Sequence, residues 1–404
     1  MKTLHEIFWL LLAYVHFHRI QCMKLKCDEV KFNFCKVNID GGRDLNVALV
    51  SEENNFTNSS EEAYEINFTI VPVDQYDGII EQLNIAYEYE NETWSDDLPK
   101  EFYENPENVQ KIQLEFQSLT KIKTSAFSGA LNLVEIDLDH NQILYISGDV
   151  FSDLKNLTVL SLTKNNLTII RSNTFHGAIN LRRLHLNQNK IEHIEDGALN
   201  LPNLENILLQ NNRLKRLSGS MFIGTPRLKE AVFEENELTQ ISEAFTHLHG
   251  LEVLILDYNE IEDINLSKFA HLSKLNHLSL RKSGFHLKDI GLLDDNVNKI
   301  NSTSKLEVLD LAENGLTDGE SLISQLRLFQ RVEIVNLEYN ELGYLGHVYQ
   351  LKKWYPYLKI VNLAYNPVSC EWVENYVAYL NRRDLKVYPW LNSSNGCVPD
   401  EEEL

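Results

Sequence analysis

Apolar residues recur in one fixed frame along most of the chain. The frame is L-x-x-L-x-L-x-x-N-x-L, and about eleven copies of it lie between residues 109 and 368. One copy consists of Leu157, Leu160, Leu162, Asn165 and Leu167. The alternation within L-x-L predicts a short strand whose leucines face a core and whose x residues face away from it. Strands that return so regularly predict an α/β solenoid, in which parallel strands form a concave sheet over one continuous core.

Two further features repeat in step with the leucines. An asparagine follows nine of the eleven predicted strands, and Gln117 and Ser283 take its place after the other two. The asparagine amide can both donate and accept hydrogen bonds and so satisfy backbone groups of its own turn and of the neighbouring coil. An aromatic or leucine side chain also recurs just before the next copy of the frame, at Phe127, Phe151, Phe175, Leu199, Phe222, Phe245 and Phe269. Both series are predicted to be structural, because buried amides need partners and a periodic aromatic series is typical of a core.

The period changes late in the chain. From Val109 to Leu275 the copies are 23 or 24 residues apart, whereas the next gap is 31 residues and the following two are 26. Ser283 takes the place of the asparagine at this point, and the phenylalanine series stops. We therefore predict two sub-arrays with an irregular coil around residues 283–305. Such an insertion is either functional or merely tolerated, and we favour the second.

Residues 1–22 have the order of a secretory signal peptide. Lys2 is followed by the apolar stretch 7–15 (IFWLLLAYV), which is too short to cross a bilayer. The alternative is a buried hydrophobic segment. No later stretch reaches about 18 apolar residues, so we expect a secreted chain without a membrane anchor.

The cysteines fit an exported protein with a cap at each end of the array. Removal of Cys22 with the signal leaves four, Cys27, Cys35, Cys370 and Cys397. Four cysteines allow three pairings, of which Cys27–Cys35 with Cys370–Cys397 is the simplest, so we expect disulfide-stabilised caps. The spacings do not indicate a metal site. The N-terminal cap, with a degenerate first repeat, would span residues 23–108, and the C-terminal cap, with a helix over 371–383 and an acidic tail, residues 369–404.

The sequence also contains glycosylation sequons, and its net charge disfavours some classes of binding partner. Nine N-x-S/T sequons are present, at Asn55, Asn58, Asn67, Asn91, Asn156, Asn166, Asn265, Asn301 and Asn392. In an exported chain several of them are expected to carry glycans. The formal net charge is −22. Nucleic acid and anionic membranes are therefore disfavoured as partners, because both need a basic surface.

The x positions of the strands point to a binding surface on the concave face. Apolar residues occupy positions that should face solvent at Leu208, Val232, Val253 and Ile255, and tyrosines precede the frame asparagine at Tyr258, Tyr339 and Tyr365. Exposed apolar and aromatic clusters indicate an interface. The alternative is that valine and isoleucine simply suit strands. The N-terminal end of the face is acidic, with Glu115, Glu135, Asp137 and Asp139.

Enzymatic motifs do not occur in the sequence. It contains no G-x-S-x-G, H-E-x-x-H, P-loop or dinucleotide fingerprint, so we expect neither an enzyme nor a bound cofactor or metal.

The array is similar to the extracellular leucine-rich repeat superfamily. Short segments before it, CDEVKFNFC, KVNID, Ile66-x-Phe68 and DLPKEF, resemble secreted leucine-rich repeat proteins of dipteran insects. Mosquito immune members of that group circulate in haemolymph and help complement-like factors to act on parasites and bacteria. The resemblance implies humoral innate immunity, with a complement-like or pathogen-surface protein as partner. An extracellular matrix or developmental ligand-binding protein, or an inhibitor of a secreted enzyme, would have the same build.

The chain departs from the mosquito proteins in two respects. Those proteins carry a C-terminal coiled coil and spare cysteines that join two chains. This sequence shows no heptads after the array, and no cysteine is spare once Cys22 is removed. We therefore expect a short form of the family that does not form a covalent dimer.

Overall fold

The computed structural model describes residues 109–287, apart from 117, 118, 123, 125, 263 and 265, together with residues 304–389. Before residue 109 it describes only the backbone of four strands. The chain divides into two compact units, one of residues 1–75 and 86–89 and the other of residues 76–85 and 90–404. The predicted signal peptide, Cys27 and Cys397 lie outside the described residues, so the expected cap disulfides stay predictions.

The first unit contains a small antiparallel sheet. Strands β1 (Glu29–Lys31), β2 (Phe34–Ile39) and β3 (Arg43–Ala48) follow one another in chain order. Val30 pairs with Cys35 in the register of β1 and β2.

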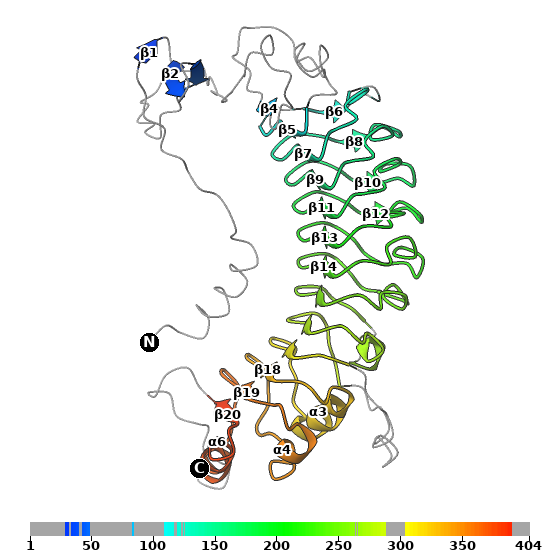
Figure 1. Ribbon diagram of the computed structural model, residues 1–404. Helices are drawn as coiled ribbons and strands as arrows, with labels where there is room; N and C mark the ends of the chain where they lie inside the picture. Colours follow the sequence, from blue (N-terminus) through cyan, green and yellow to red (C-terminus); the bar gives the residue numbers. More distant parts are fainter. Residues whose placement is uncertain are drawn as a thin grey trace, which may run out of the picture. The chain divides into compact units, whose positions relative to one another are not determined.

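The second unit is built on one parallel sheet of thirteen strands, which follow in chain order from one end of the stack to the other (Figure 1). The strands are β4 (Leu83–Asn84), β5 (Lys111–Gln113), β7 (Glu135–Asp137), β9 (Val159–Ser161), β11 (Arg183–His185), β13 (Asn206–Leu208), β14 (Glu230–Val232), β15 (Val253–Ile255), β16 (His277–Ser279), β17 (Val308–Asp310), β18 (Ile334–Asn336), β19 (Ile360–Asn362) and β20 (Lys386–Tyr388). The predicted solenoid with a parallel sheet is thereby confirmed. The sheet includes one strand on each side of residues 109–368.

The core lies directly behind this sheet. The frame leucines are fully buried, as Leu160, Leu184 and Leu254 show. Because each coil buries its leucines against the next coil, the core is continuous through the stack.

The frame asparagines bind the coils to one another. The Asn165 amide donates to the carbonyl oxygens of Leu138 (2.9 Å) and Leu162 (3.1 Å), and its oxygen accepts from the Ile143 N–H at 3.0 Å. Three backbone groups of two coils thus depend on one side chain. Asn189, Asn259 and their counterparts repeat this pattern, which confirms their structural role.

The side opposite the sheet differs between the two parts of the stack, which we call the N-terminal sub-array (residues 109–287) and the C-terminal sub-array (residues 304–389). The N-terminal sub-array has short strands there, β6 (Lys121–Ile122) paired with β8 (Tyr145–Ile146), and β10 (Ile169–Ile170) paired with β12 (His193–Ile194), followed by the 3-10 turn η3 (Leu266–Phe269). The predicted phenylalanines stack between its coils, with ring centroids of Phe127 and Phe151 6.0 Å apart.

The C-terminal sub-array has helices in place of those strands. They are α3 (Gly319–Gln325), which continues into η5 (Leu326–Leu328), and α4 (Leu351–Trp354), and Figure 1 shows α3 and α4 on the side away from β18 and β19. A helix advances only ~1.5 Å per residue, so a helical coil uses more residues than an extended one, consistent with the change from 24 to 26 residues.

The two sub-arrays share the sheet. Leu278 of β16 pairs with Leu309 of β17 in the same register as every other pair, although 31 residues separate them. Ser283 replaces part of the asparagine function, since its hydroxyl donates to the Leu280 carbonyl at 2.7 Å. Its backbone N–H donates at 3.1 Å to the side chain of Asn314, the frame asparagine of the next coil. Residues 288–303 of the predicted irregular coil lie outside the described residues.

The C-terminal end has the predicted helix. It runs through α5 (Cys370–Trp372), the π-helical η6 (Val373–Val377) and α6 (Ala378–Asn381). The Ser369 side chain caps its first turn, and the Trp372 indole N–H donates to the Leu345 carbonyl at 3.1 Å. Cys370 is disulfide-bonded.

Candidate protein-binding surface

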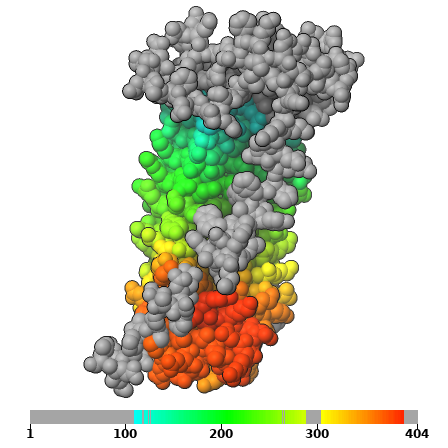
Figure 2. Space-filling view, turned by 90° about the vertical axis from the view of Figure 1, so that its left-hand side faces the viewer, coloured from blue at the N-terminus to red at the C-terminus, as the bar shows by residue number. Residues whose placement is uncertain are grey.

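The strand face of the sheet alternates between buried and accessible side chains. In β15 Leu254 is buried, whereas Val253 and Ile255 on either side are half-buried and belong to the opposite face. Figure 2 looks onto this side of the stack, where the coils follow one another from cyan to red. The side chains at these positions form columns across the coils, because neighbouring strands pair without a shift in register.

Two of the predicted contact residues are not accessible. Leu208 is 9% exposed and Val232 5% exposed, so the expectation that they present apolar surface to solvent is wrong. They are successive members of one column, because β13 pairs with β14 so that Leu208 lies opposite Val232. Strands ~4.8 Å apart on a concave face bring such side chains together, and they shield each other from water. Of the four apolar residues predicted there, Val253 and Ile255 remain partly open.

The tyrosines belong to a second column, which we call the rim column. It consists of the residue before each frame asparagine, or before Gln117 and Ser283 where these replace it. Its members are Phe116, His140, Lys164, Gln188, Asn211, Glu235, Tyr258, Lys282, Glu313, Tyr339 and Tyr365. All eleven have φ between 45° and 59°, in the left-handed region that residues other than glycine rarely adopt. The stack compensates this strain in ten of the eleven turns, where the backbone N–H donates to a carbonyl of the next coil. The Tyr339 N–H, for example, donates to the Ala364 carbonyl at 3.0 Å.

Neighbouring members of the rim column contact each other through their side chains. Phe116 stacks on His140 with ring centroids 4.2 Å apart, and the Lys282 ammonium lies 5.8 Å from the centre of the Tyr258 ring. Tyr339 stacks on Tyr365 at 4.1 Å. Sequence reasoning found the three tyrosines but missed Phe116 and His140. Their position before the frame asparagine was the signal that could have found them.

The N-terminal end of the face holds carboxyl groups close together. Burial, followed by the nearby carboxylate of Asp137, raises the pKa of Glu115 to about 7. Burial also raises the pKa of Asp139 to about 6, although its carboxylate accepts from the Ser161 hydroxyl at 2.6 Å. The Lys111 ammonium lies 2.8 Å from the Glu135 carboxylate. This end of the face is therefore acidic, as predicted, and part of its charge is held in a poorly hydrated site.

Two carboxylates of the C-terminal sub-array form ion pairs with one guanidinium. Arg281 lies 2.5 Å from the Glu313 carboxylate and 3.9 Å from that of Glu338. Burial raises the pKa of Asp310, whose oxygens accept from the Ala312 N–H at 2.8 Å and the Asn336 amide at 2.9 Å. These side chains form one network across three coils.

The middle of the face is poorly hydrated. Burial lowers the pKa of His277 to about 4 and raises that of Asp257 to about 7. His277 is therefore neutral at physiological pH, while Asp257 is only partly ionised. Apolar and weakly charged groups at the centre, with charged groups at both ends, are typical of a protein interface.

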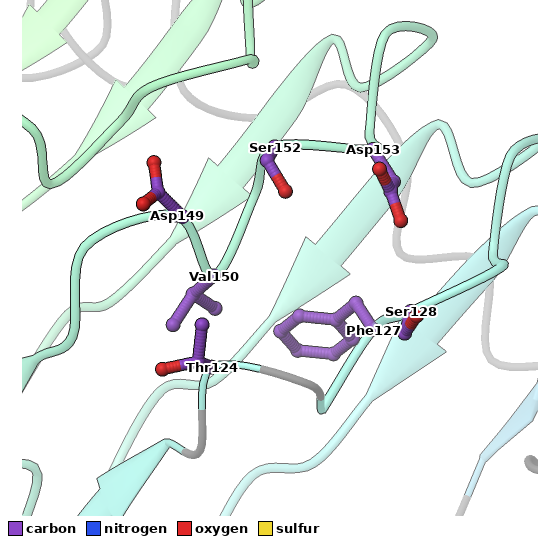
Figure 3. A pocket seen from close by; sticks show the side chains of 7 residues that line it. All are labelled: Thr124, Phe127, Ser128, Asp149, Val150, Ser152 and Asp153. Atoms are coloured by element: carbon purple, nitrogen blue, oxygen red, sulfur yellow. The ribbon is translucent and has the colours of Figure 1, made fainter.

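A shallow groove of about 760 Å³ runs along the edge next to the rim column. Tyr258, Lys282 and Glu313 of the rim column line it together with Lys215 and Arg216. A smaller hollow of about 340 Å³ lies on the other side of the coils, between Phe127, Val150 and several serine, threonine and aspartate side chains (Figure 3).

The described part of the chain holds no candidate metal site and no candidate membrane span. No group of three histidine, cysteine, aspartate or glutamate residues there is placed to hold a metal ion. No helix among these residues is both long and apolar enough to cross a bilayer. Of the nine sequons, Asn156 is exposed and Asn166 half-exposed, and the other seven lie outside the described residues.

Comparison with known proteins identifies the repeat. A family model described as a BspA type leucine rich repeat region, in six copies, matches residues 96–229, and a leucine rich repeat model matches residues 202–261 and 242–285. A search of the curated proteins found no sequence match.

Solved structures give the same result for the fold. The leucine-rich repeat protein FLRT2, in an octameric complex with Latrophilin 3 and Unc5D, is 21% identical over 72% of this chain and 88% of its own, with a TM-score of 0.55. An internalin of Listeria monocytogenes is 22% identical over 70% and 81%, with a TM-score of 0.52. The protein LIC12759 of Leptospira interrogans is 21% identical over 72% and 80%, with a TM-score of 0.50. At such identities the likeness shows the fold alone.

Proposed function

Because the chain has the leucine-rich repeat fold, we propose that it is a secreted glycoprotein that binds another extracellular protein through its concave face, in humoral innate immunity. The observation that carries the proposal is the composition of that face. Val253 and Ile255 are half-buried near the middle of the sheet, and the tyrosines of the rim column lie beside it. Accessible apolar and aromatic groups with a charged surround are a usual basis of protein recognition.

Protein binding agrees with the assembly in which one structural relative occurs. FLRT2 contributes its leucine-rich repeat region to an assembly with two other proteins. A sheet of many short strands offers a partner a wide surface whose side chains vary while the frame stays constant.

Secretion and the immune role have separate support. Cys370 is disulfide-bonded, and disulfides persist in oxidising compartments outside the cytosol. Asn156, in a sequon, is exposed on a turn away from the strands, so a glycan there would leave the concave face open. The immune role rests on the resemblance of the segments before the array to mosquito immune proteins.

The proposal is tested by affinity capture from body fluid with the secreted chain as bait, followed by mass spectrometry. A double variant, Ile255→Asp with Tyr258→Asp, places charge at the centre of the face. We expect it to bind the captured partner at least about tenfold more weakly, which corresponds to ~1.4 kcal/mol, with its thermal stability retained. The matched control is Ile223→Asp, at an isoleucine that is 62% exposed on a turn between strands and outside the columns of the concave face.

The identity of the partner decides the biological role. A thioester-containing or protease-cascade protein would support humoral immunity. Retention of the chain in insoluble matrix, or loss of a hydrolase activity on mixing, would replace that role by a matrix or an inhibitory one. Undiminished capture by the folded double variant would show that the concave face is not the binding surface.

A further inference from the structure

Two exposed tyrosines form a flat aromatic surface at the C-terminal end of the rim column. The rings of Tyr339 and Tyr365 lie 4.1 Å apart with an angle of 9° between their planes. Tyr339 is 46% and Tyr365 52% exposed, which is unusual for aromatic residues that contact each other so closely. The backbone holds them in this position, because both have left-handed φ values and the two coils pair in register through Asn336 and Asn362.

The stack has no structural duty comparable to that of the core aromatics. Phe329 and Tyr355 of the same sub-array are fully buried and fill the space between sheet and helices. Tyr339 and Tyr365 instead leave much of their surface in water, which costs free energy that burial would have recovered. Such a surface is explained when a partner covers it.

The surroundings of the stack favour a cation. Glu338, next to Tyr339 in the chain, and Glu313, one coil earlier in the rim column, share the single guanidinium of Arg281. The carboxylates of Glu313 and Glu338 thus outnumber the guanidinium that they share. The face of an aromatic ring also carries negative potential, which attracts cations.

The chain itself shows that tyrosines of this type hold cations. In the same column Lys282 lies over the ring of Tyr258 at 5.8 Å, and at the C-terminal helix the Arg383 guanidinium lies 3.6 Å from the centre of the Tyr379 ring. Among the residues that the structure describes, no lysine or arginine lies over Tyr339 or Tyr365. A cation of the chain itself lies over the rings of Tyr258 and Tyr379. The corresponding position over the Tyr339–Tyr365 stack is open to a cation of a partner.

We infer that the Tyr339–Tyr365 stack is the docking site for an arginine side chain of the partner protein. Arginine fits better than lysine because its guanidinium is flat, weakly hydrated and able to stack on a ring while it donates hydrogen bonds to a carboxylate. The inference rests on the proposed function and deepens it. The partner presents a basic segment to the C-terminal end of the concave face.

The test compares two peptides that carry equal charge. Ac-(Gly-Arg)3-NH2 and Ac-(Gly-Lys)3-NH2 are titrated into the full chain by isothermal titration calorimetry at physiological ionic strength. We expect the arginine peptide to bind about three- to fivefold more tightly, the difference that stacking at an exposed site supplies. Equal affinity for the two peptides, or binding of neither, would overturn the inference, because general attraction to a chain of net charge −22 does not distinguish them.

Substitutions at Tyr339 and Tyr365 test whether the preference for the arginine peptide depends on the stack. In the double variant Tyr339→Leu with Tyr365→Leu the preference should fall to about one, whereas Tyr339→Phe with Tyr365→Phe should keep it because the ring faces remain. Tyr357→Leu is the matched control, since Tyr357 is equally exposed but stacks on no other ring among the described residues. Should the leucine double variant unfold, Tyr365→Leu alone replaces it and should halve the preference. A preference that survives in a folded leucine variant would place the arginine elsewhere.

Partner capture separates this inference from the proposed function. If Ile255→Asp with Tyr258→Asp abolishes capture while the leucine double variant captures fully, the concave face binds the partner but the stack does not. If instead the leucine double variant lowers capture while Ile255→Asp with Tyr258→Asp captures fully, the stack binds the partner and the proposed surface at the centre of the concave face is wrong.

Discussion

The coils before and after residues 288–303 share one sheet but differ on the side opposite to it. The N-terminal sub-array fills that side with phenylalanines stacked from coil to coil, such as Phe222 and Phe245 with centroids 6.2 Å apart. The C-terminal sub-array fills it with helices and with the buried rings of Phe329 and Tyr355. The aromatic moves from six residues before the next frame leucine to three, because a helical turn presents a different residue to the core. The same parallel sheet is therefore compatible with either of two structures on its opposite side, stacked phenylalanines or helices.

The two sub-arrays also differ in whether their clustered carboxylates have a basic counterion. Glu115, Asp137 and Asp139 crowd together at the N-terminal end, with pKa values raised first by burial. In the C-terminal sub-array the carboxylates of Glu313 and Glu338 are partly neutralised by Arg281, from the last coil of the N-terminal sub-array. The first arrangement destabilises the free protein at neutral pH, and the second ties three coils together.

The largest effects are expected from the aromatic core. Phe222→Ala and Tyr355→Ala each remove a buried ring and should lower the free energy of unfolding by about 3–5 kcal/mol. Tyr355→Phe removes only the hydroxyl that donates to the Ile323 carbonyl and should cost about 1 kcal/mol. Chemical denaturation gives these values. Hydrogen exchange should rise first in the sub-array that carries the substitution, and an equal rise in both would show that the stack unfolds as one unit.

A smaller effect is expected at the guanidinium that joins the coils. Arg281→Met leaves the carboxylates of Glu313 and Glu338 without their counterion and should destabilise the chain by about 2 kcal/mol, less than for a fully buried pair. Arg213→Met is the control, because Arg213 and Glu192 form an exposed pair at 3.9 Å that should contribute almost nothing. Equal melting temperatures for the two variants would remove the proposed difference between the sub-arrays in their treatment of charge.

The smallest effect, and one of opposite sign, is expected at the acidic end. The pKa of Glu115 is raised from its ordinary value of 4.5 to about 7 in the folded chain. Between these two values the folded state binds more protons than the unfolded state, so this group makes stability fall as the pH rises from 4.5 to 7. Glu115→Gln should therefore raise the melting temperature at pH 7.5, and the gain should shrink as the pH falls towards 4.5. A gain that is constant over this range would contradict the raised pKa.

Part of the candidate site followed from the sequence. The frame assigned Val253 and Ile255 to the accessible face correctly, because alternation within a strand is a local property. It failed at Leu208 and Val232, whose burial depends on the side chains of neighbouring coils. Phe116 was missed because a lone aromatic residue before a degenerate asparagine position carries little signal in one sequence.

The sequence by itself determined the repeat, the inward side chains, the asparagine hydrogen bonds and the position where the period changes. These follow from residue types at fixed spacing within one or two coils. Only the tertiary structure decided the left-handed rim column, the stack of Tyr339 on Tyr365 and the contact between Arg281 and Glu313. Those features exist because stacking brings residues 24–32 positions apart into contact and compensates, through hydrogen bonds to the next coil, a backbone conformation that an isolated turn would not keep.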